Sequence, residues 1–177
     1  MISRPFTEIP RIVVVNGDVC SGSSTIAREI STSLSYDYVD VGQLFRLELK
    51  RDPSLNLGRL SLQLNEKVRD RIATGSKCVI EGRLVGQQAQ GFEDIGKVLC
   101  TAQESVILRR YMEREGIPYA ELAMQSLTAR YTHDDEILSK TWGITRADAL
   151  NPGLYDVAID TSHSSPAEIV RDLGFST

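Results

Sequence analysis

The chain has 177 residues, of which 41% are hydrophobic, and its formal net charge at pH 7 is −4. This length is typical of one domain, and the hydrophobic fraction is enough for one sizeable core. The acidic balance argues against a chain-wide attraction to nucleic acid or to an anionic membrane surface, so we expect neither partner.

Strand patterns alternate with helix patterns along the chain. Short apolar runs predict strands at residues 12–16, 36–41, 77–80, 96–101 and 156–160. Helical spacing and capping residues predict helices at residues 25–35, 42–50, 57–75, 105–115, 118–130 and 166–173, with Pro118 in the first turn of its helix. Gly75 and Gly116 are the expected ends of two of these helices.

This alternation predicts an α/β fold with a parallel sheet between two layers of helices. No repeat, low-complexity tract or linker divides the sequence, so we expect one domain over residues 1–177. The least regular stretches are 52–57 and 131–151. We expect these stretches to be mobile insertions over the site.

Three cysteines, Cys20, Cys78 and Cys100, are an odd and sparse set that does not form a disulfide framework. Cys78 and Cys100 fall in apolar runs, which predicts buried thiols in a reducing compartment. The first ten residues lack the apolar region of a signal peptide, and no apolar stretch approaches the ~20 residues of a membrane span. We therefore expect a soluble, cytoplasmic protein.

The segment 17–24, GDVCSGSS, nearly matches the phosphate-binding pattern G-x-x-x-x-G-K-[ST]. Ser23 stands where the pattern has lysine, and Ser24 occupies the position whose hydroxyl binds Mg²⁺. A strand precedes the segment and a helix follows, so its amide groups and the positive helix end favour phosphate binding. The alternative is a Gly/Ser-rich turn in which Ser23 or Ser24 caps the helix. The residues predicted to bind the cofactor are Gly17, Asp18, Val19, Cys20, Ser21, Gly22, Ser23, Ser24 and Thr25.

Further segments follow in an order that resembles a known family. They are the strand and loop from residue 12, YVDVGQLFR at 38–46, VIEGRL at 79–84, RYMEREG at 110–116 and YDVAIDT at 155–161. In this order they resemble the cytidylate kinase-like family of nucleoside monophosphate kinases over most of the chain. The lysine-free GSST at 22–25 is similar to the archaeal-type branch, which implies that lacking the lysine need not abolish kinase activity.

The resemblance implies a P-loop kinase fold with a helical insertion that binds the nucleoside monophosphate, a lid, ATP as donor and Mg²⁺. It also implies that Arg46 and Arg83 bind the acceptor phosphate, with Asp40 nearby. Their alternatives are a solvent-facing helix arginine for Arg46, a salt bridge with Glu81 for Arg83, and a helix cap for Asp40. Glu81 is expected either to bind Mg²⁺ through a water molecule or to pair with Arg83.

The family has a lid with two arginines, of which this chain matches only one. Arg130 matches the first arginine, and Ile137 stands at the position of the second. Arg109 lies in one helix with Arg110 and Arg114, and this cluster is expected to offset the lost charge in part. Arg110 and Arg114 share one face of the helix. Their alternative is pairing with Glu113, Glu115 or Glu121 on the surface.

Together these features predict a monomer that phosphorylates a nucleoside monophosphate with ATP, most simply CMP or dCMP. Two alternatives remain open at this point. One is a nucleotide-binding regulatory protein that has lost catalysis with the charges at positions 23 and 137. The other is a P-loop kinase that acts on a different small molecule.

Overall fold

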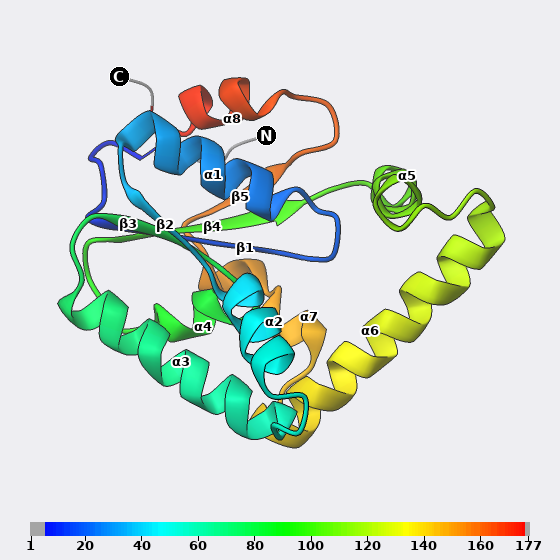
Figure 1. The fold of residues 1–177 in the computed structure, drawn as a ribbon. Helices are drawn as coiled ribbons and strands as arrows, with labels where there is room; N and C mark the ends of the chain where they lie inside the picture. Colours follow the sequence, from blue (N-terminus) through cyan, green and yellow to red (C-terminus); the bar gives the residue numbers. More distant parts are fainter. Residues whose placement is uncertain (1–5, 176–177) are drawn as a thin grey trace.

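The protein is built on one parallel sheet, with helices on both of its faces. The computed structural model describes residues 6–175. The five strands have the order β2-β3-β1-β4-β5, and every neighbouring pair is parallel (Figure 1). They span Ile12–Gly17 (β1), Asp37–Asp40 (β2), Cys78–Glu81 (β3), Ile95–Thr101 (β4) and Val157–Asp160 (β5). The predicted α/β sheet is thereby confirmed, with strand ends that differ from the predictions by one residue at most.

The helices form two layers and an arm that projects from the sheet (Figure 1). Their bounds are Ser23–Leu34 (α1), Val41–Arg51 (α2), Leu57–Thr74 (α3), Val85–Gln88 (α4), Glu104–Glu115 (α5), Ala120–Trp142 (α6), Arg146–Ala149 (α7) and Pro166–Asp172 (α8), with a 3₁₀ turn at Pro152–Leu154 (η1). Helices α1 and α8 cover one face of the sheet, and α3 and α4 cover the other. None of these helices is long and apolar enough to cross a membrane.

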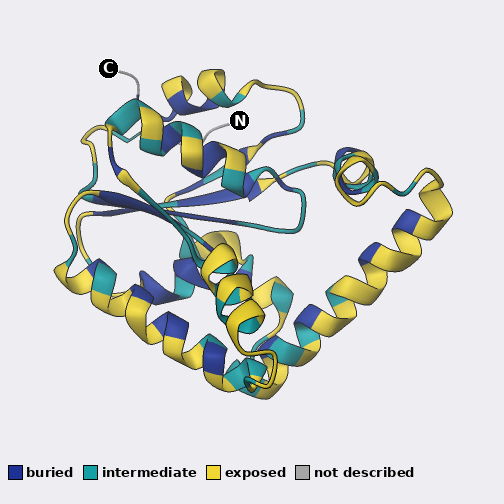
Figure 2. Ribbon diagram, viewed as in Figure 1, coloured by how far each residue is buried: buried dark blue, intermediate teal, exposed yellow. Residues whose placement is uncertain are grey.

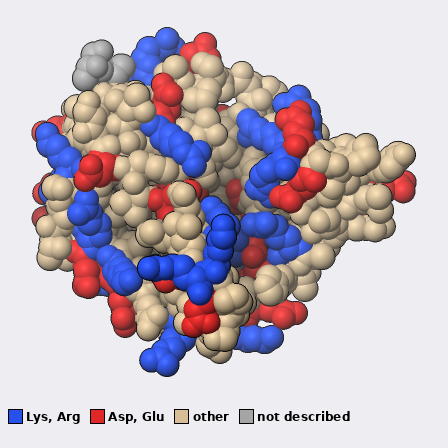
Figure 3. All heavy atoms as spheres, viewed as in Figure 1, with Lys and Arg blue, Asp and Glu red and all other residues tan. Residues whose placement is uncertain are grey.

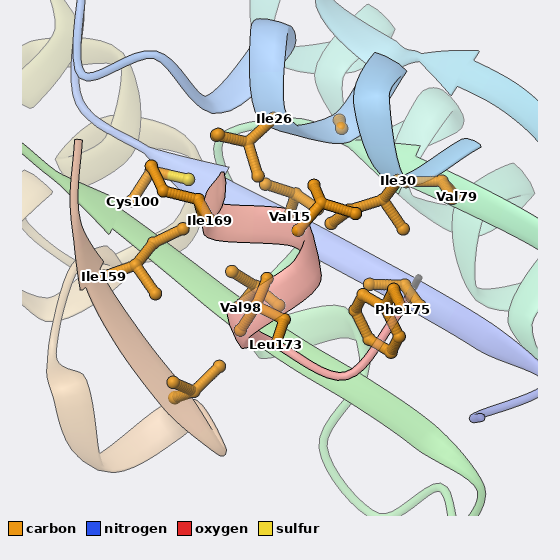
Figure 4. Packing of buried hydrophobic residues seen from close by; sticks show 14 of the residues in the cluster. Val15, Ile26, Ile30, Val79, Val98, Cys100, Ile159, Ile169, Leu173 and Phe175 are labelled. Atoms are coloured by element: carbon orange, nitrogen blue, oxygen red, sulfur yellow. The ribbon is translucent and has the colours of Figure 1, made fainter. Parts of the chain in front are cut away.

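Side-chain alternation along β1 explains the two layers. Val13 and Val15 pack in the core beneath α1 and α8, whereas Ile12 and Val14 pack against α3 and α4. Figure 4 shows the first of these cores, in which residues from α1, α8 and four strands meet. Each buried Val or Ile contributes about 1.5–3 kcal/mol relative to an exposed one. The central strand is therefore anchored on both faces, and its carboxyl end is a rigid base for the loop that follows.

The cysteine predictions are confirmed where the structure can test them. Cys78 and Cys100 are buried as free thiols in the two cores, and Cys20 is a half-buried free thiol in the loop after β1. Burial raises the pKa of both buried thiols, which keeps them protonated.

Helix α6 corrects the sequence analysis most strongly. The helix begins at Ala120, so Pro118 lies before it, and it continues to Trp142 instead of ending near residue 130. Buried residues recur along one side of it at helical spacing, and exposed residues cover its other side (Figure 2). Within the polar run 131–136, Thr132, His133 and Glu136 are exposed, whereas Asp134 is buried. The prediction of an irregular insertion over 131–151 is therefore wrong for most of that stretch.

Short elements near α6 also escaped the sequence analysis. Thr145 and Asp148 form a capping box that begins α7, and α4 and η1 are each shorter than five residues. The stretch 52–56 between α2 and α3 is irregular, as predicted. Gly75 and Gly116 cap α3 and α5, which confirms both predicted helix ends.

Candidate functional site: a phosphate-binding cavity rimmed by arginines

The carboxyl ends of β1, β2 and β3 meet at one edge of the sheet, where Gly17, Asp40 and Glu81 end their strands. Ligands of open α/β sheets bind at this edge. A cavity of about 190 Å³ lies there, and most of the predicted site residues line it. They are Gly17, Asp18, Val19, Cys20, Ser23, Ser24, Asp40, Arg46, Glu81, Arg83, Arg114 and Arg130.

Other predicted residues line a second cavity of about 460 Å³ beside the loop. Gly22, Thr25 and Arg110 belong to it, and it shares Ser23 and Ser24 with the first cavity. Ser21 lines neither of the two cavities, because it is fully buried beneath the loop. The structure thus brings all of the predicted site residues except Ser21 to two adjoining cavities.

Two glycines shape the loop. A Cβ atom on Gly17 would lie 2.1 Å from Ser21 Oγ and 2.9 Å from the carbonyl oxygen of Cys100, so no side chain fits there. Gly22 adopts φ of 89°, a left-handed conformation that glycine takes without strain. Gly22 caps α1 without a side-chain hydrogen bond, so the alternative in which Ser23 or Ser24 caps this helix is wrong. The first amide groups of α1 have no intrahelical partner and can bind an anion.

Ser23, at the position of the missing lysine, makes a defined contact of its own. Its hydroxyl donates a hydrogen bond of 3.0 Å to Glu81 Oε1. Burial raises the pKa of Glu81, and the hydrogen bond from Ser23 opposes that effect. Glu81 forms no ion pair with Arg83, so the alternative that paired these two residues is wrong.

Arg83 is paired with Asp134 of α6 instead. Arg83 Nη2 lies 2.7 Å from Asp134 Oδ2, and the Asp134 side chain is only 9% exposed. This pair joins the segment after β3 to α6 across 51 positions of sequence. Asp134 was not among the predicted site residues. An acidic residue at helical spacing from Leu127 and Leu138, and so on the same helix face, is the sequence signal that could have indicated it.

Asp40 and Arg46 lie at the start of α2. Asp40 Oδ1 accepts a hydrogen bond of 2.7 Å from the amide of Gln43, so the predicted helix cap is present. The carboxylate also lies 3.9 Å from Arg46 and 3.7 Å from Arg28. The Arg46 side chain is 68% exposed, which leaves its guanidinium accessible at the rim of the cavity.

The two arginines of α5 have different environments. Arg110 donates to the carbonyl oxygen of Cys20 at 3.2 Å and to the carbonyl and hydroxyl oxygens of Thr161 at 2.7 and 2.9 Å. It therefore ties the loop to the end of β5, and it forms none of the surface pairs offered as its alternative. Arg114 pairs with Glu115 at 2.8 Å, which is one of the pairs expected, and still reaches both cavities.

The lid positions lie on α6 near a third cavity. This cavity of about 390 Å³ is mainly apolar and is lined by α2, α3 and α6. Ile137 and His133 line it, whereas Arg130 lines both it and the phosphate cavity. Within residues 6–175 Arg130 takes part in no ion pair, so its charge is available to a ligand.

Arg146 is a residue of the phosphate cavity that the sequence analysis did not identify. It forms an ion pair with Asp18 of the loop, and its guanidinium carbon lies 4.0 Å from the centroid of the Tyr131 ring. Burial raises the pKa of Asp18, and hydrogen bonding to Val19 and the charge of Arg146 oppose that rise. No local sequence signal marks Arg146, because its place beside the loop depends on where α6 ends and α7 begins.

Comparison with known proteins narrows the interpretation of this site. No protein-family model matches the chain. The chain is 29% identical to the cytidylate kinase of Sulfurisphaera tokodaii, a match that covers 90% of this chain and 91% of the relative. It is 27% identical to the cytidylate kinase of Haloarcula marismortui over 90% and 85% of the two chains. These similarities over about nine-tenths of the chain support a cytidylate kinase-like family.

Solved structures agree with this fold. An uncharacterized protein from Eubacterium ventriosum superimposes with a TM-score of 0.69 at 13% identity, covering 92% of this chain and 98% of the other. A shikimate kinase from Acinetobacter baumannii superimposes with a TM-score of 0.61 at 13% identity, covering 94% and 91%. The predicted P-loop kinase fold is confirmed.

This cytidylate kinase-like chain surrounds its phosphate loop with arginines. Figure 3 shows basic side chains gathered over α2 and beside α5, on the side to which the strand ends point. Five arginines line the phosphate cavity, namely Arg46, Arg83, Arg114, Arg130 and Arg146. Guanidinium groups bind phosphate oxygens in a planar, two-pronged geometry, so the cavity is suited to phosphates despite the negative charge of the whole chain.

Proposed function

We propose that this protein transfers the terminal phosphoryl group of ATP to a nucleoside monophosphate, with CMP or dCMP as the acceptor. One domain over residues 1–177, acting as a monomer in the cytoplasm, would carry the activity. The observation that supports this proposal most strongly is the single cavity that joins the phosphate loop to Arg46 and Arg83. Cytidylate kinases similar over about nine-tenths of the chain support the choice of acceptor.

The donor nucleotide would lie along the loop. The loop amide groups and the positive end of α1 favour its phosphates. The cavity of about 460 Å³ beside the loop, between α1, α5 and the segment after β5, has room for its nucleoside. Arg114 lies between this cavity and the phosphate cavity, where it can contact the donor phosphates.

The acceptor nucleoside would occupy the apolar cavity of about 390 Å³. This cavity meets the phosphate cavity at Gly42, Arg83 and Arg130, which line both. Ser61 and Asn65 are polar residues on its α3 wall, and the largely buried Asn65 side chain forms no hydrogen bond to the described residues. A base can therefore stack on the apolar side chains while Asn65 hydrogen-bonds to its edge. A base without the matching donor or acceptor would leave Asn65 unpaired, and the site would bind that base less tightly.

Mg²⁺ would be held by oxygen ligands from Ser24 and, through a water molecule, Glu81. Hydroxyl and carboxylate oxygens suit this cation, which usually keeps water and substrate phosphates as its remaining ligands. No group of three or more metal-binding side chains exists within residues 6–175, which agrees with a site completed by the substrate. When bound, the cation would neutralise part of the negative charge of the phosphates.

The chemistry needs positioning more than proton transfer. The attacking oxygen of the acceptor phosphate is already anionic, so no general base is required. Its new bond to the γ-phosphorus forms as the bond to the β,γ-bridging oxygen breaks, and ADP leaves. Arg130 and Arg114 stabilise the charge that is shared between the two nucleotides, while α6 excludes water from them.

Turnover with a panel of acceptors tests this proposal. The purified chain is incubated with ATP, Mg²⁺ and CMP, dCMP, UMP, AMP or GMP, and the nucleotides are separated by chromatography. We expect CDP and ADP in equal amounts, with CMP or dCMP preferred. Ser24→Ala should lower the rate, whereas the exposed Ser105→Ala should leave it unchanged. ATP binding in calorimetry without turnover of any acceptor would instead indicate a regulatory nucleotide-binding protein.

A further inference from the structure

Arg146 is held rigidly beside the phosphate loop, although α7 has only four residues. The amide of Arg146 donates to Asp135 Oδ1 at 2.7 Å, which fixes the start of α7 against α6. At the other end of α7, the carbonyl oxygen of Ala149 accepts hydrogen bonds from buried Asn16 at 3.2 Å and from Tyr155 at 2.7 Å. The backbone of Arg146 is therefore anchored independently of its side chain.

The Arg146 side chain is directed toward the loop by two groups. Tyr131 lies against the guanidinium plane, and Asp18, the second residue of the loop, pairs with Nη1. Stacking and ion pairing restrict the guanidinium to one orientation, so little conformational entropy is lost when it binds a ligand. The Arg146 guanidinium is therefore preorganised for ligand binding.

Most of the hydrogen-bonding capacity of this guanidinium remains unused. An arginine has five N–H donors, and the one hydrogen bond that this side chain forms within residues 6–175 is the one to Asp18. Nε is buried and has no partner there. An unpartnered buried donor is costly unless a ligand or water molecule satisfies it. The cavity that Arg146 shares with Ser23 and Ser24 is where such a ligand would lie.

The other arginines around the cavity are less suited to this position. Arg83 is paired with buried Asp134, Arg114 with Glu115, and Arg46 lies beside Asp40 on an exposed rim. Arg130 is exposed on α6. Arg146 alone among the five forms an ion pair with a residue of the loop itself, within the described part of the chain.

We propose that Arg146 is a catalytic residue that contacts the terminal phosphate of the donor. In this role Arg146 supplies a positive charge to the donor phosphates. Two such charges are missing from this chain, because Ser23 stands at the position of the loop lysine and Ile137 at the position of the second lid arginine. Asp18 orients the guanidinium before binding and shares it with the phosphate afterwards. The inference rests on the proposed phosphoryl transfer, but its binding test does not depend on turnover.

Binding of ATP and ADP in the absence of an acceptor is the first test. Calorimetry compares the wild-type chain with Arg146→Ala, Arg146→Lys and Arg109→Ala, the last being an exposed arginine of α5 that lines none of the three cavities described. A contact with the terminal phosphate predicts that Arg146→Ala weakens ATP binding about 10- to 100-fold and ADP binding less than about 2-fold. Arg109→Ala should change neither.

An equal loss of ATP and ADP affinity in Arg146→Ala, with a lowered melting temperature, would overturn the proposal, because it would mean that Arg146 only anchors α7. Arg146→Lys keeps the charge and tests the need for the planar fork. We expect it to keep the melting temperature of the wild type and to recover ATP affinity only in part. Full recovery of ATP affinity would also count against the proposed geometry.

Turnover provides the second test. If the chain is an active kinase, Arg146→Ala should lower kcat about 10³-fold or more, with little change in KM for the acceptor. A fall in kcat of less than about 10-fold would overturn the catalytic role. If the wild-type chain has no turnover, the proposed function fails, and the ratio of ATP to ADP affinity still decides whether Arg146 contacts the terminal phosphate.

Discussion

The phosphate loop and the lid helix α6 present charge to the same cavity by different physical means. The loop depends on backbone geometry, since Gly17 allows close approach and Gly22 begins α1 with its first amide groups unpaired. Helix α6 depends on side chains that pair over long distances, such as Asp134 with Arg83. Substitutions in the loop should therefore abolish binding, whereas substitutions on α6 should redistribute affinity and stability.

The largest expected effect is that of Gly17→Ala. The added Cβ would lie 2.1 Å from Ser21 Oγ and 2.9 Å from the Cys100 carbonyl, so the loop must shift away from its phosphate-binding shape. We expect nucleotide binding to be lost in calorimetry, with a destabilisation of about 1–3 kcal/mol in urea unfolding.

Gly91→Ala is the matched control for this substitution. Gly91 has φ of +80° but no atom within 4 Å of the added Cβ, so its cost is backbone strain alone, about 1–2 kcal/mol. Nucleotide binding should survive this change. If Gly17→Ala also kept its nucleotide affinity, the backbone of the loop would not be what binds phosphate.

A smaller effect is expected at the pair between Arg83 and Asp134. Arg83→Ala leaves the Asp134 carboxylate buried without its partner, so we expect a loss of about 1–3 kcal/mol in stability. The side chain of Arg83 is 36% exposed, and this places the loss below that of a fully buried pair. The same variant should raise KM for the acceptor, because one phosphate ligand is removed.

The double variant Arg83→Ala with Asp134→Ala separates these two consequences. Removing both partners should recover part of the lost stability, since no buried charge is left unpaired. It should not recover KM for the acceptor. Recovery of both would mean that Arg83 serves only to hold α6, and recovery of neither would mean that the two residues act independently.

The smallest effect on stability is expected from Glu81→Gln, and it should depend on pH. Burial raises the folded-state pKa of Glu81, so ionisation of this carboxyl destabilises the folded protein. The penalty is present above the folded-state pKa and disappears as pH falls below the ordinary glutamate value, where the carboxyl is protonated in both states. The melting temperature of Glu81→Gln should therefore exceed that of the wild type at pH 7, and the two should converge near pH 4.

The dependence of the reaction rate on pH tests the role of Glu81 at the metal site. If Glu81 acts as a carboxylate at the metal, the rate of the wild type should fall as the pH drops and this carboxyl becomes protonated. Glu81→Gln should be slow at every pH and should lack this acidic limb. An unchanged pH profile in this variant would remove Glu81 from the metal site.

Elements with local patterns could be predicted from the sequence. The β1 strand has a run of apolar residues, α3 repeats its leucines at helical spacing, and the loop has two glycines at the spacing that phosphate binding needs. The second half of α6 could not be predicted from its polar run at 131–136. Its buried side is formed by single residues a turn or two apart, and only contact with α3, α5 and α7 makes that side necessary.

The sequence by itself determined the sheet, the phosphate loop and the absence of its lysine, because these depend on residues that are neighbours along the chain. The tertiary structure alone decided which charges meet at that loop. Asp18 and Arg146 are separated by 128 positions, and their pairing depends on where α6 ends and α7 begins. No short sequence pattern predicts a contact over this separation, because the contact depends on the lengths of several helices and turns between the two residues. For this reason Arg146 emerged only once the chain was folded.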